Sequence, residues 1–429
     1  MEKLFKNSWA LFTGIGIIMI AHGLQGNLMG IRAVIEEFNY VSTGIMMSGY
    51  YVGYFLGSNM TPKLVSRVGH IRVFAAFASL SSLSILIIAA YVNPVVWTLG
   101  RFLTGLSLVS CYIVAESWLN DRANNRTRGK ILSAYMFITY IGLAVGMLLL
   151  NFDNPKNFKP FILVSILLSV ALIPILLTKR KAPKFKKIGT LKIKELYKIS
   201  PLGFVSSFCT GVIYSALFTL AAVYASIINF SVFEISLLLF LITVAGALAQ
   251  GPIGYFSDQF DRRGVIILCS TICVIFCFLS IIVSGDTLQY IDIVVDPGSD
   301  KLMFFIFVTI YAGASLSLFP LNLSHTNDFV PKEKFVAAGG GLQLVFGLGA
   351  MGGPITCSYF MNIFGPNGFF FFLGIFHVIV ALFGTFRIFV RPTVDNPEST
   401  FTPLPRNITP LGMELDPDTG VDLSSSDKK

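Results

Sequence analysis

Charged side chains are scarce in this chain. Aspartate, glutamate, lysine and arginine make up 13% of its 429 residues, against about 25% in a typical soluble protein. A polar surface therefore cannot cover the molecule, which excludes an ordinary soluble globular protein. Hydrophobic residues account for 54% of the chain and the mean hydropathy is +0.73. Both values are typical of an integral membrane protein.

Twelve apolar stretches approach the roughly 20 residues that a helix needs to cross a bilayer. The sequence therefore predicts an all-α membrane protein with twelve transmembrane helices. The first stretch has no small-x-small cleavage site and ends at Arg32, so we expect a true span and not a signal peptide. The predicted spans are 8–30, 43–62, 70–91, 95–119, 129–151, 160–178, 201–228, 234–256, 264–284, 302–325, 335–362 and 367–390.

Lysine and arginine are distributed unevenly about these spans. With a cytoplasmic N-terminus, 27 of the 32 basic residues fall in cytoplasmic segments, which fits the positive-inside rule. We therefore expect a multi-pass protein of the cell (inner) membrane with both termini in the cytoplasm. The net charge of +9 then reflects orientation and contact with anionic membrane lipids, and not binding to nucleic acid.

The chain divides into two similar halves of six spans. An Asn-Asp pair follows the fourth span at Asn120 and the tenth span at Asn327, and glycine-rich runs occur in the fifth and eleventh spans. Parallel six-span repeats are typical of transporters built from two bundles. The predicted units are an N-terminal six-helix bundle at 1–178, a cytoplasmic basic linker at 179–200, a C-terminal six-helix bundle at 201–390 and a disordered cytoplasmic tail at 391–429.

Two features leave alternatives open. Periodic lysines with Ile188, Leu191, Ile193 and Leu196 in the linker fit either an amphipathic element on the membrane surface or a plain charged connection. All six cysteines lie in apolar stretches, where a role as small hydrophobic residues is favoured over a metal or redox site. We expect no metal and no cofactor.

Several motifs resemble those of a known family. Gly254-x-x-x-Asp258 followed by Arg262-Arg263 resembles the loop signature of the major facilitator superfamily, and GRFLTG at 100–105 resembles its second signature. RVGHIRVFAA, ESWLN, SDQFDRR and HTND resemble the YcaD-like branch of that superfamily, and the likeness extends to about residue 390. The resemblance implies two pseudo-symmetric bundles and a central site lined by the first, fourth, seventh and tenth spans. Ser66 stands where the first loop copy usually has an aspartate, so the second copy is the one expected to gate.

Polar side chains follow one helical face in each of those four spans. Because such groups are costly against lipid, the faces predict a wet central cavity. Arg32 fits snorkelling as well as substrate binding, His22 fits packing as well as a proton or ligand role, and His325 fits a gate. The substrate-binding candidates are His22, Gln25, Arg32, Arg101, Tyr214, Tyr311, Asn322 and His325, with Tyr135, Tyr140, Gln250 and Gln343 as secondary lining candidates.

The charge of this cavity indicates a class of substrate. Its candidates are arginines and histidines, and the middle of the first, seventh and tenth spans carries no acid. A site for organic cations usually needs a buried carboxylate to offset desolvation. We therefore expect a small anionic or zwitterionic solute as the substrate, with protons as the coupling ion.

The motif at the inner end of the eighth span predicts a gate. Asp258 and Arg262 are expected to form a latch with Arg128 and Glu116 of the other half, which would hold the inner side closed. The alternative is that the arginines only keep this loop in the cytoplasm. The full set of gating candidates is Glu116, Arg128, Asp258, Arg262, Arg263 and Asp328.

These observations predict a secondary active transporter that works by alternating access, as a monomer and not as an enzyme. No Walker motif is present, so ATP is not the expected energy source. The first alternative is an efflux pump for multiple drugs and other hydrophobic compounds, since 40 phenylalanines could line a permissive cavity. Alternatives of another class are a membrane enzyme using His325, Asn327 and Asp328, and a membrane sensor or receptor without transport.

Overall fold

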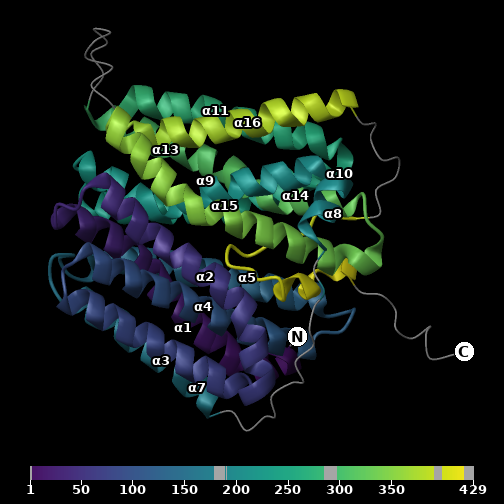
Figure 1. Ribbon diagram of the computed structural model, residues 1–429, viewed down its shortest axis with the longest axis horizontal. Coiled ribbons are helices and arrows are strands. Elements are labelled where there is room, and N and C mark those ends of the chain that lie inside the picture. The colour runs from purple at the N-terminus through teal and green to yellow at the C-terminus, as the bar shows by residue number, and fades with distance from the viewer. Residues whose placement is uncertain (1, 178–188, 190, 285–296, 391–398, 420–429) are drawn as a thin grey trace, which may run out of the picture.

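The protein is a pair of helical bundles (Figure 1). The computed structural model describes residues 2–177, 189, 191–284, 297–390 and 399–419, and its regular elements within these ranges are all helices. The N-terminal bundle contains α1 (Glu2–Ile35), α2 (Tyr40–Val68), α3 (His70–Ala90), α4 (Pro94–Arg122), α5 (Arg128–Leu148), η1 (Leu149–Phe152), α6 (Lys159–Val170) and α7 (Leu172–Leu176). The C-terminal bundle contains α9 (Pro201–Ile227), α10 (Val232–Gln259), α11 (Arg262–Ser284), α13 (Pro297–Leu316), α14 (Leu318–Asn327), α15 (Phe335–Phe364) and α16 (Gly368–Val390).

The predicted all-α membrane fold is confirmed. Among the described residues, 11 helical segments are long and apolar enough to cross a membrane, and α5 with η1, α6 with α7, and α13 with α14 each count as one of them. The twelfth long helix is α2, with 29 residues. Its second half is less apolar because it carries Asn59, Thr61 and Lys63.

Local sequence fixes where several helices begin. Pro94 starts α4, where a missing N–H is harmless, and the Asn93 side chain accepts hydrogen bonds from the N–H groups of Val95 and Val96. Ser231 and Glu234 form a capping box at the start of α10. These caps satisfy backbone donors that the helices themselves leave unpaired.

The two bundles pack alike. In the N-terminal bundle α1 contacts α5, α2 contacts α4 and α3 contacts α6; in the C-terminal bundle the corresponding contacts join α9 to α15, α10 to α13 and α11 to α16. Glycine allows the closest of these approaches. A Cβ on Gly105 of α4 would overlap the Tyr50 carbonyl oxygen of α2, and one on Gly349 of α15 would overlap the Phe208 carbonyl oxygen of α9.

The main contacts between the bundles join α1 to α9, α2 to α15 and α5 to α10, and α2 also touches α9. We call the end of the molecule with the α2–α3, α4–α5 and α10–α11 connections the basic end, and the other the opposite end. At the opposite end the bundles touch directly. Gly44 of α2 lies against Ser358 of α15, and the Asn151 amide donates to the Ser236 hydroxyl over 2.7 Å.

A C-terminal segment (399–419) lies between the bundles toward the basic end, drawn in yellow in Figure 1. It contains two short 3-10 turns, η3 (Gly412–Leu415) and η4 (Pro417–Thr419). Leu404, Ile408, Met413 and Leu415 in it are each at most 3% exposed.

The prediction of a disordered tail is therefore wrong for residues 399–419. Prolines interrupt any long helix there, but partners on both bundles bind its backbone and cover the scattered apolar side chains. The remaining tail residues, 391–398 and 420–429, lie outside the described residues.

Much of the predicted linker also lies outside the described residues. Its described part contains α8 (Ile193–Ile199). Leu196 of α8 is fully buried, and the helix packs on α9 and α15. This contact holds the end of the linker against the C-terminal bundle.

Candidate functional site

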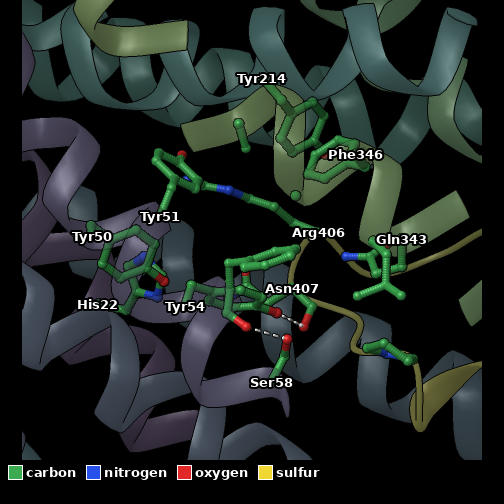
Figure 2. Close-up of a pocket in the computed structure, with 15 residues that line it drawn as sticks. His22, Tyr50, Tyr51, Tyr54, Ser58, Tyr214, Gln343, Phe346, Arg406 and Asn407 are labelled. Carbon is green, nitrogen blue, oxygen red and sulfur yellow. Dashed lines mark hydrogen bonds between the residues drawn. The ribbon is translucent and has the colours of Figure 1, made fainter. Parts of the chain in front are cut away.

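A central cavity lies between the bundles (Figure 2). Its wall comes from α1, α2, α9, α15 and the C-terminal segment. Aromatic side chains dominate this wall. The main lining side chains are His22, Tyr50, Tyr51, Tyr54, Tyr214, Gln343, Phe346, Arg406 and Asn407.

Arg101 of α4 lies in the adjoining part of the same cavity, with His22, Tyr51 and Phe218. Its side chain is 3% exposed, and its guanidinium carbon lies 4.8 Å from the centre of the Tyr50 ring. Among the described residues no carboxylate forms an ion pair with Arg101, and its Nε is buried without a hydrogen-bond partner. A buried guanidinium in this state favours an anionic partner in the cavity, because an uncompensated buried charge is costly.

Two further candidates from α1 reach α4. His22 Nδ1 lies 2.7 Å from the Tyr112 hydroxyl, and the imidazole ring also faces Tyr50, with 5.5 Å between ring centres. The Gln25 amide donates to Thr104 Oγ1 over 3.2 Å. His22 thus lines the cavity, whereas Gln25 joins α1 to α4 behind it.

Other candidates lie elsewhere in the structure. Arg32 forms an ion pair with Glu36, 2.5 Å apart, and donates to the carbonyls of Pro155 and Lys156 at the opposite end. Tyr311 faces inward within its own bundle, where its hydroxyl lies 3.3 Å from His377 Nε2 of α16. The Asn322 amide donates to Thr210 Oγ1 of α9 over 3.4 Å.

A cluster of charged residues occupies the basic end of the C-terminal bundle. Arg262, 4% exposed, pairs with Asp258 over 2.8 Å and with Asp328 over 2.6 Å. Arg263 pairs with Asp261 over 2.7 Å. His325 lines a hollow beside the cluster. Burial raises the pKa of Asp328 to about 6, although the Arg262 charge opposes this rise.

The two latch residues from the other bundle do not join this cluster. Tyr135 donates to Glu116 Oε1 over 3.1 Å, and Arg128 donates to the Glu414 carbonyl over 3.1 Å and to Thr419 Oγ1 over 3.0 Å. The direct contact between Asp258 and Arg128 expected from the sequence is absent from the described residues in this conformation.

The C-terminal segment instead bonds to the predicted gating residues of both bundles. Glu116 accepts from the N–H and the hydroxyl of Thr409. Asp258 accepts from the N–H of Phe401 over 2.9 Å, and Arg262 donates to Ser399. Gating candidates of the two halves are therefore connected through this segment.

Three of the secondary lining candidates, Tyr140, Gln250 and Gln343, also bond to the segment. Gln250 accepts from the N–H of Leu404 over 2.8 Å, and Gln343 donates to the Ile408 carbonyl over 2.9 Å. Arg406 and Asn407, which line the cavity, were missed because the tail has no continuous apolar run. The signal that was present is the spacing of Leu404, Ile408, Leu411 and Leu415.

With this geometry in view, comparison with known proteins decides the family. The family model described as Major Facilitator Superfamily matches residues 11–295 and 203–417. The chain belongs to the Major Facilitator Superfamily. The expected membership is thereby confirmed, and with it a multi-pass membrane transporter of the secondary class.

Curated relatives point to the same branch of the Major Facilitator Superfamily. The chain is 22% identical over 359 residues to a protein of Escherichia fergusonii described as the uncharacterized MFS-type transporter YcaD, a match that covers 83% of this chain and 89% of that protein. It is 21% identical over the same length to the YcaD protein of Escherichia coli K12. The YcaD-like resemblance is thus confirmed.

Solved structures share the fold of this superfamily member. A mutant form of the nucleoside transporter NupG matches with a TM-score of 0.74 at 12% identity, over 88% of this chain and 98% of that one. A bacterial homologue of the human lysosomal transporter Spinster matches with a TM-score of 0.68 at 15% identity, over 90% and 98%. A D-xylose-proton symporter matches with a TM-score of 0.66 at 13% identity, over 94% and 99%.

Proposed function

We propose that this superfamily member moves a small anionic or zwitterionic organic solute across the cell membrane by alternating access, coupled to protons. The basic end then faces the cytoplasm, as the distribution of lysine and arginine favours. The central cavity between the bundles is the solute site. Asp258, Arg262 and Asp328, with Glu116 and Arg128 across the interface, act as the gate at its cytoplasmic side.

The observation that carries this proposal is the state of Arg101. Its guanidinium is buried beside the cavity, contacts the Tyr50 ring and has no ion-pair partner among the described residues. Arg406 brings a second guanidinium to the same cavity. A carboxylate or phosphate on the solute would supply the missing negative charge, and guanidinium groups bind both in bidentate fashion.

The arrangement of the two ends supports alternating access. The bundles meet directly at the opposite end, through Gly44 with Ser358 and Asn151 with Ser236. Toward the basic end the C-terminal segment lies between them. We interpret this conformation as inward-facing. The absence of a described contact between Asp258 and Arg128 agrees with this interpretation, because the two are expected to meet only when the inner side is closed.

Proton coupling is supported by the titratable side chains in the path. His22 lines the cavity, and Glu116 lies fully buried near the inner end of α4. A D-xylose-proton symporter is among the solved structures with this fold. We propose His22 and Glu116 as the groups whose protonation accompanies transport.

A second candidate function is efflux of hydrophobic compounds. The aromatic wall of Tyr50, Tyr51, Tyr54, Tyr214 and Phe346 favours it. Such a wall binds flat apolar molecules without a fixed pattern of hydrogen bonds. The charge of Arg101 distinguishes the two candidates, since an apolar solute leaves it unpaired.

A binding screen of the purified full-length chain tests the proposal. Metabolite carboxylates and phosphates, neutral solutes and lipophilic cations are compared by thermal shift. We expect anions to raise the melting temperature of the wild type, with the effect lost in Arg101→Gln and partly kept in Arg101→Lys. Stabilisation by lipophilic cations alone would overturn the proposal in favour of efflux. Counterflow of the stabilising anion in proteoliposomes then separates a carrier from a sensor.

A further inference from the structure

We propose that the C-terminal segment (399–419) is an autoinhibitory plug. It occupies the central cavity and the space between the bundles at the basic end, and it must withdraw before the carrier can bind solute fully and change conformation. This inference rests on the proposed function only where solute is concerned. The position of the segment and its effect on the bundles can be measured without any solute.

The first argument is occupancy. Arg406 extends across the cavity toward Tyr51 (Figure 2), and its guanidinium carbon lies 3.2 Å from the centre of the Phe218 ring. Three separate spaces of about 50, 20 and 10 Å³ remain around it, each lined by Arg406. A small-molecule site usually measures about 300–1,000 Å³. The segment therefore divides one site into spaces fit only for water.

The second argument is that both bundles hold the backbone of the segment. From the N-terminal bundle, Tyr54 donates to the Asn407 carbonyl over 3.2 Å and Asn120 donates to the Leu411 carbonyl over 2.7 Å. From the C-terminal bundle, Gln343 and Gln250 bond to Ile408 and Leu404. A segment bonded to both sides of the interface resists any movement that brings those sides together.

The third argument is that side chains of the proposed gate are bonded to the segment and not to one another across the interface. Glu116 and Arg128 bond to Thr409, Glu414 and Thr419, while Asp258 bonds to Phe401. Closure of the inner side needs these side chains to meet one another. While the segment is docked they cannot, because its backbone lies between them.

Docking is nevertheless reversible on physical grounds. Arg406 and Arg101 line the same space beside Phe218, and no described carboxylate lies among the residues that line it. Two like charges in one cavity disfavour the docked state. An anionic solute competes for the same volume and would be attracted by Arg101 once Arg406 leaves.

One position in the segment allows a variant whose substitution lies outside the membrane-spanning helices. A Cβ on Gly412 would lie 2.6 Å from Ile408 Cγ1 and 2.8 Å from the Glu116 carboxylate carbon. Gly412→Trp should therefore expel the segment. Thr400 is exposed, so Thr400→Trp adds the same side chain without that clash and serves as the matched control.

The first measurement reports docking in the full-length chain. A cysteine at Met413, 2% exposed, is labelled with a membrane-impermeant maleimide and compared with a cysteine at exposed Thr400; the six native cysteines are buried. We expect Met413→Cys to react at least about tenfold more slowly than Thr400→Cys, as for other sites that react only after local opening. Addition of Gly412→Trp should remove most of this difference. Equal rates for the two cysteines in the unmodified chain would overturn docking.

The second measurement reports the distance between the two bundles at the basic end. Spin labels at exposed Lys130 of α5 and exposed Gln259 of α10 give their separation at the basic end. We expect one long distance in the full-length chain and with Thr400→Trp, and an added shorter distance with Gly412→Trp or after removal of residues 399–429. If neither release variant adds a shorter distance, the plug proposal is overturned.

The solute screen separates the plug proposal from the proposed function. We expect anions to stabilise Gly412→Trp more strongly than the wild type. Equal stabilisation of both would overturn the plug while leaving an anion transporter intact. Absence of anion binding in both, with a shorter distance appearing in Gly412→Trp, would overturn the anion proposal and leave the plug intact.

Discussion

Glu116 of α4 accepts a hydrogen bond from the backbone N–H of Thr409, with 3.1 Å between nitrogen and Oε1. The residues are 293 positions apart in the chain, and both are fully buried. The bond joins the N-terminal bundle to the end of the chain. A carboxylate that the sequence suggests as part of a gate between bundles is thus satisfied by a peptide group.

The Glu116–Thr409 contact gives the first prediction. Glu116→Ala leaves the N–H of Thr409 without its acceptor, and an unpaired buried donor costs about 1–3 kcal/mol. We expect maleimide labelling of Met413→Cys to speed up by roughly fivefold or more. Glu116→Gln keeps an acceptor oxygen at this place and should stay closer to the wild type. Slow labelling in the alanine variant would show that this bond contributes little to docking.

The second prediction concerns pH and Asp416. Burial raises the pKa of Asp416 to about 6; the nearby Asp418 charge adds to the rise, while the N–H of Asp418, the Thr402 hydroxyl and the Arg128 charge oppose it. A raised pKa means that the docked segment binds this proton more tightly than the released one. Docking is then strongest below the ordinary pKa of 3.8 and weakens as pH rises through about 6.

We therefore expect labelling of Met413→Cys, normalised to Thr400→Cys, to rise about tenfold between roughly pH 5 and pH 7, since one pKa unit is a tenfold change in equilibrium. Asp416→Asn should remove most of this dependence. The pKa of Asp328 is also raised to about 6. Its protonation therefore favours docking in the same direction, and a weaker pH dependence of labelling can remain in Asp416→Asn. A profile that rises toward low pH would contradict the assignment.

The third prediction compares two members of the charged cluster. Arg262→Leu leaves the buried Asp328 without its cation and should destabilise the protein by about 3–5 kcal/mol. Asp258→Asn changes a carboxylate that is 36% exposed, and exposed pairs contribute only about 0–1 kcal/mol. Thermal unfolding in detergent measures both. Similar losses for the two variants would mean that Asp258, and not Asp328, is the main partner of Arg262.

Transport rates give the fourth prediction. Asp258→Asn should slow exchange of an anion in proteoliposomes without abolishing its binding, because the proposed function assigns Asp258 to the gate and Arg101 to the solute. The expected change is in the rate and not in the affinity measured by thermal shift. A variant with unchanged transport would exclude Asp258 from the gate.

The fifth prediction tests the close packing of α2 on α4. Gly105→Leu drives a side chain into the Tyr50 backbone and should cost several kcal/mol or prevent folding, as overpacking in tight interfaces does. Gly251→Leu is the matched control, because a Cβ there meets nothing within 4 Å. Expression and melting temperature distinguish the two. Equal tolerance would contradict the described α2–α4 contact.

Hydropathy and motif spacing were enough to predict the helices and their division into halves. Both signals are local, and lipid leaves few alternatives for an apolar stretch of this length. The cavity was only partly predictable. Periodicity assigns His22, Tyr214 and Tyr311 alike to polar faces of their helices. His22 and Tyr214 line the cavity, but Tyr311 faces His377 within its own bundle. Which neighbour a helical face meets is a property of packing, and the sequence of one helix does not contain it.

The C-terminal segment shows a different limit. Its prolines, acids and short apolar steps resemble those of a solvated tail, and its order depends on partners such as Gln250 and Glu116 that lie far away in the sequence. Each of those polar side chains suggested a cavity or gate. That they share the C-terminal segment as a partner follows only from the folded structure.

The C-terminal segment is also covalently attached, through α16, to one of the two bundles on which it docks. Only residues 391–398 separate α16 from the C-terminal segment. A tether of this length sets an effective concentration on the order of millimolar. Weak individual contacts therefore suffice to keep the segment bound, whereas the same peptide added in solution would need a comparable concentration to replace it.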